Sequence, residues 1–281
     1  MRHFVYIRDM SWVGTAKSQN TKDRMEDEVV ARTWKGGGLF AVLDGHNGRT
    51  AVEFAALHLP QYILDSVAFK KGNFQEAIQQ GISRTEKELL VFLKRDAAAS
   101  FEDTNSEDID FPLLTSGVVV CLVLVEDETI FTANVGDCRA VLSRSNSAVQ
   151  LTNDHNIHDP VEMERVKPFI SSEGFVRGLM VTRSLGNINV RSLEKCEGQI
   201  AEPSLSHFPI CDSDEFLLVA SDGLYEVISN EVAIATVHRA MKRPSFTPDH
   251  AAKELVERAL ARGSCDNICV CLIMLRRPRY S

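Results

Sequence analysis

The sequence predicts an α+β fold, a four-layer α-β-β-α sandwich in which two mainly antiparallel sheets lie face to face and helices cover their outer sides. Apolar, β-branched segments fall in groups, and helical patterns lie between these groups instead of alternating with single strands. A doubly wound parallel sheet would require that alternation. The 281 residues contain no internal repeat and no Pro/Gly/Ser-rich linker, and they can bury a large core. We therefore expect a single domain.

Seven segments have the length and residue types of strands: 28–34, 38–43, 116–125, 128–135, 138–144, 215–220 and 268–275. The third, fourth and fifth are separated only by the short polar turns Glu126-Asp127 and Gly136-Asp137. This spacing predicts a meander of three antiparallel strands, with Asp137 in a hairpin turn.

Five segments repeat apolar residues at helical spacing: 49–65, 73–95, 159–166, 229–241 and 248–261. The last has Ala251, Leu255 and Ala259 on one face and ends before Gly263. The polar, acidic stretch 96–110 after the second of these segments predicts a surface loop.

Composition and charge exclude several classes of protein. With 44% hydrophobic and 25% charged residues, the chain has the composition of a soluble globular protein. The balance of 31 basic and 39 acidic residues gives a net charge of −8, which disfavours nucleic acid as a partner. The longest apolar stretch, 113–125, is too short to span a membrane. The N-terminus lacks the apolar segment of a signal peptide.

The seven cysteines are scattered, and none forms a paired Cys-x-x-Cys array. That spacing excludes a zinc ribbon, and most of the cysteines lie inside apolar runs, where cysteine acts as a small hydrophobic residue. We expect a reducing compartment, the cytoplasm or the nucleus.

Two apolar runs end abruptly at Asp-Gly pairs, Asp44-Gly45 and Asp222-Gly223. Each pattern is typical of a buried strand that ends in a carboxylate, although an isolated Asp-Gly pair is equally typical of a turn. A third acid, Asp266, precedes the apolar run 268–275. Gathering buried carboxylates is costly unless a cation neutralises them, so we expect a metal site between the sheets at one edge.

The acidic pair Glu26-Asp27 is a weaker signal, because such pairs usually lie on the solvated surface. Here β-branched residues follow the pair, and the chain then turns through three glycines into the strand that ends at Asp44. A hairpin of this kind would bring Glu26 and Asp27 close to Asp44.

At this point the residues resemble the metal-dependent protein phosphatases of type 2C, which remove phosphate from serine and threonine. Seven motifs occur in that family's order between about residues 12 and 275: Met25-Glu26-Asp27, Asp44-Gly45-His46, Ala133-Asn134-Val135-Gly136-Asp137-Cys138-Arg139-Ala140, Leu151-Thr152-Asn153-Asp154-His155, Thr182-Arg183-Ser184-Leu185-Gly186, Ala220-Ser221-Asp222-Gly223-Leu224-Tyr225-Glu226 and Cys265-Asp266-Asn267. Any one tripeptide is common, but the ordered set is specific. The resemblance implies one catalytic domain over residues 1–281.

The resemblance also implies a site for two Mn²⁺ or Mg²⁺ ions. Asp44 would bridge the ions, Asp222 and Asp266 would complete one, and the Gly45 carbonyl with Glu26 would help to hold the other. Asp27 belongs to the same set of metal-site residues, and a third, weaker ion would involve Asp137, Asp222 and Glu226. Water activated by the two ions would attack the phosphate in line, without a phospho-enzyme intermediate.

In the family a histidine after the Asp-Gly pair is the general acid for the leaving alkoxide, a role that falls here on His46. The family's phosphate-binding arginine is replaced by Lys22, which cannot form a bidentate fork to phosphate. On an extended strand Lys22, Arg24 and Glu26 would share one face, so Arg24 could assist Lys22 in binding the phosphate. His46 and Lys22 are therefore the predicted catalytic residues.

Smaller departures are Asn187 in place of an aspartate, Tyr225 in place of a tryptophan, and a short segment between Arg165 and Arg177, where relatives carry a variable flap. Asp154, His155 and Arg183 are interpreted as hydrogen-bonding scaffold rather than as chemistry.

The leading hypothesis is an active phosphatase that acts as a monomer on phosphoserine and phosphothreonine proteins. A catalytically weak or dead relative that acts as a regulatory scaffold is the alternative, and the replacement by Lys22 is the feature in its favour. A two-metal nuclease would require a basic face that the net charge does not indicate.

Overall fold

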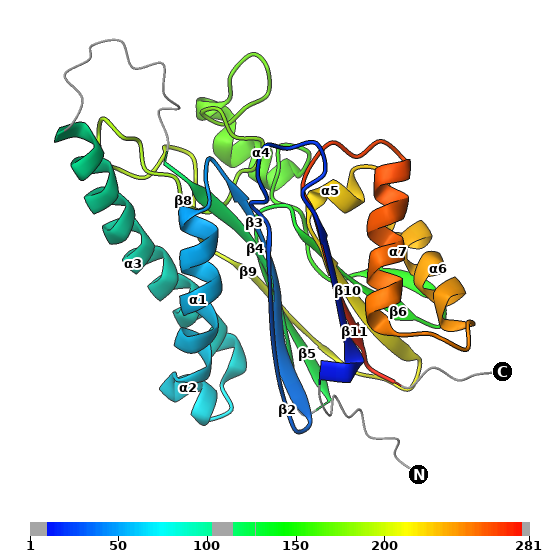
Figure 1. The fold of residues 1–281 in the computed structure, drawn as a ribbon. Coiled ribbons are helices and arrows are strands. Elements are labelled where there is room, and N and C mark those ends of the chain that lie inside the picture. The colour runs from blue at the N-terminus through cyan, green and yellow to red at the C-terminus, as the bar shows by residue number, and fades with distance from the viewer. Residues whose placement is uncertain (1–9, 103–114, 127, 277–281) are drawn as a thin grey trace.

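The computed structural model describes residues 10–102, 115–126 and 128–276, which form two sheets packed face to face (Figure 1). One sheet has five strands in the order β1-β11-β10-β6-β7, comprising β1 (Val13–Ser18), β11 (Ile268–Met274), β10 (Asp214–Ala220), β6 (Arg139–Arg144) and β7 (Ser147–Gln150). The other has six, in the order β2-β3-β4-β5-β9, with the short β8 paired to β4. These are β2 (Glu28–Trp34), β3 (Gly37–His46), β4 (Gly117–Glu126), β5 (Thr129–Val135), β8 (Leu185–Gly186) and β9 (Ser204–Pro209).

Helices cover the outer face of each sheet, so the predicted four-layer arrangement is confirmed (Figure 1). The six-stranded sheet is covered by α1 (Thr50–Leu64), α2 (Val67–Lys70) and α3 (Phe74–Glu102), and the five-stranded sheet by α6 (Asn230–Met241) and α7 (Pro248–Ala261). Short helices lie at one end of the sandwich: α4 (Pro160–Val166), the 3-10 helix η2 (Lys167–Phe169) and α5 (Asp222–Tyr225). A further 3-10 helix, η1 (Met10–Trp12), precedes β1.

The central strands are buried on both faces, which is why they read as continuous apolar runs. In β3, Leu39 and Leu43 pack toward α1 and α3, whereas Phe40 and Val42 pack into the core between the sheets. This alternation follows from the two-residue period of a strand. The strand therefore runs through the middle of the sandwich and reaches its edge at Asp44.

The predicted strands and helices are present with small shifts in their ends, but the predicted meander is wrong at its third strand. Strand β5 pairs with β4, as expected, whereas β6 pairs with β10 and β7 in the opposite sheet. The chain crosses between the sheets at Gly136, whose φ of +112° suits glycine. Asp137 follows this crossing, so it lies between the sheets and not in a hairpin turn.

The predicted loop at 96–110 is wrong in its first part, because α3 continues to Glu102. Three consecutive alanines at positions 97–99 have high helix propensity and extend the helix. The remainder of that predicted loop, from residue 103, lies outside the described residues.

Several short elements had no sequence signal, among them β1, β7, β9, α2 and α5. Strand β9 is an edge strand whose side chains are mostly exposed or half-buried, so it lacks the alternating apolar pattern of a half-buried strand. All seven cysteines are free. No helix in the described part of the chain is long and apolar enough to cross a bilayer.

Candidate metal centre

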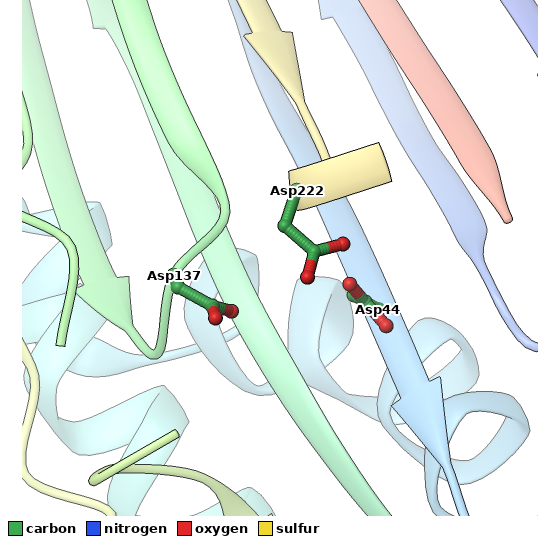
Figure 2. A group of neighbouring side chains, drawn as sticks. All are labelled: Asp44, Asp137 and Asp222. Carbon is green, nitrogen blue, oxygen red and sulfur yellow. The ribbon is translucent and has the colours of Figure 1, made fainter. Parts of the chain in front are cut away.

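Three carboxylates from distant parts of the chain meet at the edge of the sandwich. Asp44 lies near the end of β3, Asp222 begins α5 directly after β10, and Asp137 follows the crossing from β5 to β6. One carboxylate oxygen of each lies within 4.8 Å of the others, and the side chains point toward a common space (Figure 2). We call Asp44, Asp137 and Asp222 the carboxylate triad.

Two glycines allow the backbone to come close around the triad. The Gly45 amide donates a hydrogen bond to the Glu26 carbonyl at 3.1 Å, and a Cβ on Gly45 would lie 2.5 Å from that oxygen. A Cβ on Gly223 would lie 2.1 Å from the Asn267 carbonyl oxygen. The glycine in each Asp-Gly pair is therefore required by a close approach of backbone, and not only by a turn.

Burial and mutual repulsion raise the pKa values of these acids. Burial, followed by the charges of Asp27, Asp222 and Asp137, raises the pKa of Asp44 well above its usual value. Burial and then the charge of Asp222 do the same to the pKa of Asp137. The pKa of Asp222 rises to about 6 because of burial and the charges of Asp266 and Glu226. Without a cation, the triad is therefore partly protonated near neutral pH.

The donor set fits hard divalent cations. The triad offers only carboxylate oxygens, which Mg²⁺ and Mn²⁺ prefer over nitrogen or sulfur ligands. A divalent cation would also remove the repulsion that raises these pKa values. The sequence prediction assigned Asp137 only to a third, weaker ion, whereas the structure places it beside Asp44 and Asp222.

Asp27 lies next to the triad but outside it. Its side chain is 1% exposed and accepts a hydrogen bond from the Ser221 hydroxyl at 2.8 Å. Ser221 in turn accepts one from the Cys269 amide at 2.9 Å. Burial raises the pKa of Asp27 to about 7, while the hydrogen bond from Ser221 opposes the rise. Asp27 thus links the segment before β2 to the end of β10.

Glu26 is brought near Asp44, as the predicted hairpin requires, since β2 and β3 pair with Glu28 opposite Leu43. Its carboxylate accepts a hydrogen bond from the Gly48 amide at 2.7 Å. Its own amide donates to the Asn267 side-chain oxygen at 2.6 Å. Asn267 also donates to the carbonyls of Gln19 and Arg24, so it holds the whole 19–26 segment against the start of β11.

Lys22 and Asp266 form an ion pair at 2.8 Å beside the triad. Burial by itself would lower the pKa of Lys22, but the hydrogen bond and charge of Asp266 and the charges of Asp222 and Asp44 raise it. Lys22 is therefore a cation that faces the candidate metal centre, with half of its side chain accessible to solvent.

The predicted common face of Lys22, Arg24 and Glu26 is wrong, because residues 20–24 form a turn and bends instead of an extended strand. Asn20 adopts a φ of +54°, and its side-chain Nδ2 donates to the Asp266 backbone carbonyl at 3.0 Å. Together with Asn267, this bond curls the segment, and Arg24 is exposed. The predicted assistance of Arg24 in phosphate binding depended on this common face, so the structure does not support it.

His46 lies two residues beyond Asp44, and its Nε2 is 3.0 Å from the Asn187 side-chain oxygen. That oxygen also accepts from the Ser184 hydroxyl at 2.6 Å, and the Asn187 amide nitrogen donates to the Thr115 carbonyl at 3.3 Å. These partners orient the Asn187 amide, so Nε2 of His46 is the protonated nitrogen. Burial lowers the pKa of His46 despite the bond to Asn187.

Asp154, His155 and Arg183 serve as scaffold, as expected. Asp154 accepts two hydrogen bonds from Arg139, at 3.1 and 2.5 Å. The His155 Nδ1 accepts from the Gly136 amide at 3.1 Å, at the crossing between the sheets. Arg183 pairs at 2.6 Å with Glu162, a buried acid on α4.

Glu162 is one of three supporting residues that sequence reasoning missed. Burial would raise its pKa, but hydrogen bonds from Arg183, Arg165 and Thr182 lower it to about 2. The other two are Ser221, which holds Asp27, and Asn187, which holds His46. Ser221 lies within a recognised motif and Asn187 directly follows one, so their positions were the available signal for these supporting roles. Glu162 is an ordinary acid on an amphipathic segment and offered none.

Comparisons with known proteins agree with this geometry. The family model described as "Protein phosphatase 2C" matches residues 12–268. "Probable protein phosphatase 2C 21" of Arabidopsis thaliana is 27% identical, with 86% of this chain and 80% of that protein covered. "Probable protein phosphatase 2C 22" of the same plant is 32% identical over 84% of this chain, which spans only 58% of that protein. The solved structure of a serine-threonine phosphatase 2C from Toxoplasma gondii has the same fold, with a TM-score of 0.74, 16% identity and coverage of 93% of this chain and 94% of that one.

The raised pKa values predict that Mn²⁺ stabilises the protein more strongly as the pH rises. Asp27 and Asp222 have folded-state pKa values of about 7 and about 6, above their usual 3.8. Between about pH 4 and 7 the metal-free folded state therefore binds more protons than the unfolded chain, and this contribution to stability is lost as the pH rises. Since Mn²⁺ competes with these protons, the increase in Tm grows over the same range. We expect about 5 to 15 °C at pH 7.5 when Mn²⁺ is at 100 to 1,000 times its Kd.

Thermal denaturation of Asp222→Asn provides the matched test. Removing one charge should raise the Tm in EDTA and reduce the increase caused by Mn²⁺. Asp212→Asn, at an aspartate whose side chain is 91% exposed, should leave the wild-type increase intact. A melting curve of the wild-type protein that is insensitive to Mn²⁺ at every pH would contradict the assignment of this site.

Proposed function

Because the chain belongs to the protein phosphatase 2C family, we propose that it is a Mg²⁺- or Mn²⁺-dependent phosphatase that hydrolyses phosphoserine and phosphothreonine in protein substrates. The observation that carries the proposal is the carboxylate triad, which gathers three acids at the open edge of the sandwich. Membership of the family supports a metal-dependent protein phosphatase. The proposed part is that this chain is catalytically active and that its substrates carry phosphoserine or phosphothreonine.

Hydrolysis of a phosphate monoester requires that negative charge on the phosphoryl oxygens be offset and that water be activated. Divalent cations supply both effects when they are bound. In this chain Asp44, Asp137 and Asp222 would hold them, with Asp266 and Glu26 on the adjacent segments. Ser221 and Asn267 keep these segments in place through buried hydrogen bonds.

Lys22 would bind a phosphoryl oxygen. Its ammonium group already lies 2.8 Å from Asp266, and the charges of Asp222 and Asp44 keep it protonated. An ammonium group provides a point charge to the phosphate instead of the planar fork of arginine. Of the two basic side chains in the 19–26 segment, Arg24 is exposed, whereas Lys22 pairs with Asp266 beside the triad.

His46 would protonate the leaving oxygen of serine or threonine. Its Nε2 proton is held by Asn187, so Nδ1 is the ring atom that exchanges a proton with the substrate. The protonated imidazolium is then the acid, and the negative charge of a bound phosphate favours that form. Asn187 acts as a positioning residue, because it fixes the ring orientation without reaching the substrate itself.

Hydrolysis of a phosphothreonine peptide tests the proposal directly. We expect turnover with Mn²⁺ or Mg²⁺, no turnover in EDTA, and a loss of kcat of at least about 100-fold in Asp222→Asn, since removing one electrostatic stabiliser from an active site typically has this effect. Release of inorganic phosphate measures all three. Asp212→Asn is again the exposed control.

A folded protein that binds Mn²⁺ but shows no metal-dependent turnover would overturn the proposal. That result would favour the regulatory scaffold instead. Circular dichroism and the Mn²⁺-dependent increase in Tm establish folding and metal binding independently of activity.

Substitution of Lys22 tests the assigned phosphate contact. Lys22→Ala should lower kcat/KM for the phosphopeptide by about 10- to 100-fold, which corresponds to the loss of one charge-assisted hydrogen bond. Lys22→Arg should retain the activity or improve it, because arginine can bind two phosphoryl oxygens. Steady-state kinetics of both variants measure the effect.

Arg24→Ala is the matched control for Lys22→Ala, since Arg24 is the neighbouring exposed base in the same segment. It should change kcat/KM less than three-fold, within the range of an exposed charge. Unchanged kinetics in Lys22→Ala would show that phosphate is held elsewhere.

A further inference from the structure

A cavity of about 310 Å³ opens beside the carboxylate triad and is not used by the chemistry described above. Asp137 and Asp222 line part of it, so it is continuous with the candidate metal centre. The rest is lined mainly by residues 156–158 and 173–175, by Met180 and by the end of α5. A group bound in this cavity would therefore lie beside the reacting phosphate.

Glu173 is the acid in this lining that neither the expected metal ions nor Arg139 already uses. Asp137, Asp222 and Glu226 belong to the expected ion sites, and Glu226 is also near the charge of Lys22. Of the basic side chains in the lining, Arg139 is paired at 2.5 Å with Asp154, and His158 is exposed. Glu173 has no basic partner within 4.0 Å among the described residues, so its carboxylate is available to a cationic group.

The same cavity has apolar walls. Ile157 and Phe175 are half-buried, and Met180 has 67% of its surface exposed although it is a large apolar residue. Apolar walls next to carboxylates match a side chain with an aliphatic stem and a cationic end, which is the structure of lysine and arginine. Apolar walls would not contribute to the binding of a metal cation, which needs oxygen ligands.

Glu173 is presented by an ordered turn. The Ser171 hydroxyl accepts hydrogen bonds from the amides of Glu173 and Phe175, at 3.3 and 3.2 Å, and the Ser171 carbonyl accepts one from Gly174 at 3.0 Å. Gly174 has a φ of +87°, which lets the turn close. The backbone of Glu173 is therefore fixed, and little ordering is needed when a substrate binds.

We infer that this cavity binds a lysine or arginine side chain of the protein substrate, next to the phosphorylated residue. The inference rests on the proposed function and adds the substrate class: phosphoproteins with a basic residue close to the phosphoserine or phosphothreonine. Because the cavity shares Asp137 and Asp222 with the metal centre, the basic residue lies within about two positions of the phosphorylated one, at about 3.3 Å per extended residue. Glu173 binds its charge, and Phe175 and Met180 contact its stem.

A set of phosphothreonine peptides tests the inference. A single lysine is moved through the two positions on each side of phosphothreonine, and each peptide is compared with its norleucine counterpart, which keeps the stem and lacks the charge. For the wild type we expect one position at which lysine raises kcat/KM about two- to five-fold over norleucine, the range of one partly exposed ion pair. In Glu173→Gln this ratio should fall toward one.

Because the lysine and norleucine peptides are compared with the same variant, a general loss of activity in that variant cancels in the ratio of their kcat/KM values. Glu173→Lys should invert the ratio, because a basic side chain there repels the substrate lysine. Glu257→Gln, at an exposed glutamate on α7, is the matched control and should keep the wild-type ratio.

Three outcomes separate failure of the inference from failure of the proposed function. Metal-dependent hydrolysis of all peptides with equal kcat/KM for lysine and norleucine would overturn the inference and leave the phosphatase intact. The same holds if the preference survives in Glu173→Lys. No hydrolysis of any peptide would instead overturn the proposed function.

Discussion

Repulsion among closely spaced carboxylates is the constraint on which the rest of this structure depends. Asp44, Asp137 and Asp222 meet within 4.8 Å, and Asp27 lies beside them with 1% of its surface exposed. Such a group destabilises the fold unless cations or protons neutralise it. The surrounding architecture opposes that repulsion: strands buried on both faces hold the backbones, and hydrogen bonds from Ser221 and Asn267 hold the segments that carry the acids.

The sequence was sufficient to predict site residues that a local pattern identifies. It was insufficient for residues whose position depends on contacts between distant parts of the chain. An apolar run that stops at Asp44 or Asp222 identifies a buried strand end, so both acids could be predicted. Asp137 could not be placed in the same way, because strand 139–144 has the same two-residue period in either sheet. Which sheet it joins depends on long-range pairing with β10. The path of Lys22 and Arg24 was mispredicted for a similar reason, since Asn267, more than 240 residues later, bends that segment through its bond to Arg24.

The site divides into a part held by the central strands and a rim of connecting segments. The triad and His46 lie at or near the ends of the central strands, and a hydrogen bond from Ser221 holds Asp27 beside them. The rim consists of connecting segments, 156–158 and 173–180, which precede and follow α4 in the sequence; Glu162 of α4 pairs at 2.6 Å with Arg183. Loops on a rigid scaffold can change without disturbing the core, and for this reason they are the usual place for specificity. If the proposed phosphatase activity holds, this division would keep the chemistry in the central part and substrate selectivity in rim residues such as Glu173.

The central claim is that the carboxylate triad binds divalent cations in exchange for protons. Calorimetric titration of Mn²⁺ into metal-free protein at pH 6.5, repeated in buffers with different ionisation enthalpies, counts the protons released per ion bound. The raised pKa values of Asp222 and Asp27, about 6 and about 7, predict net release of protons at pH 6.5, and the release from these two acids diminishes as the pH rises to 8. Binding without proton release at pH 6.5, or no binding at all, would contradict the account.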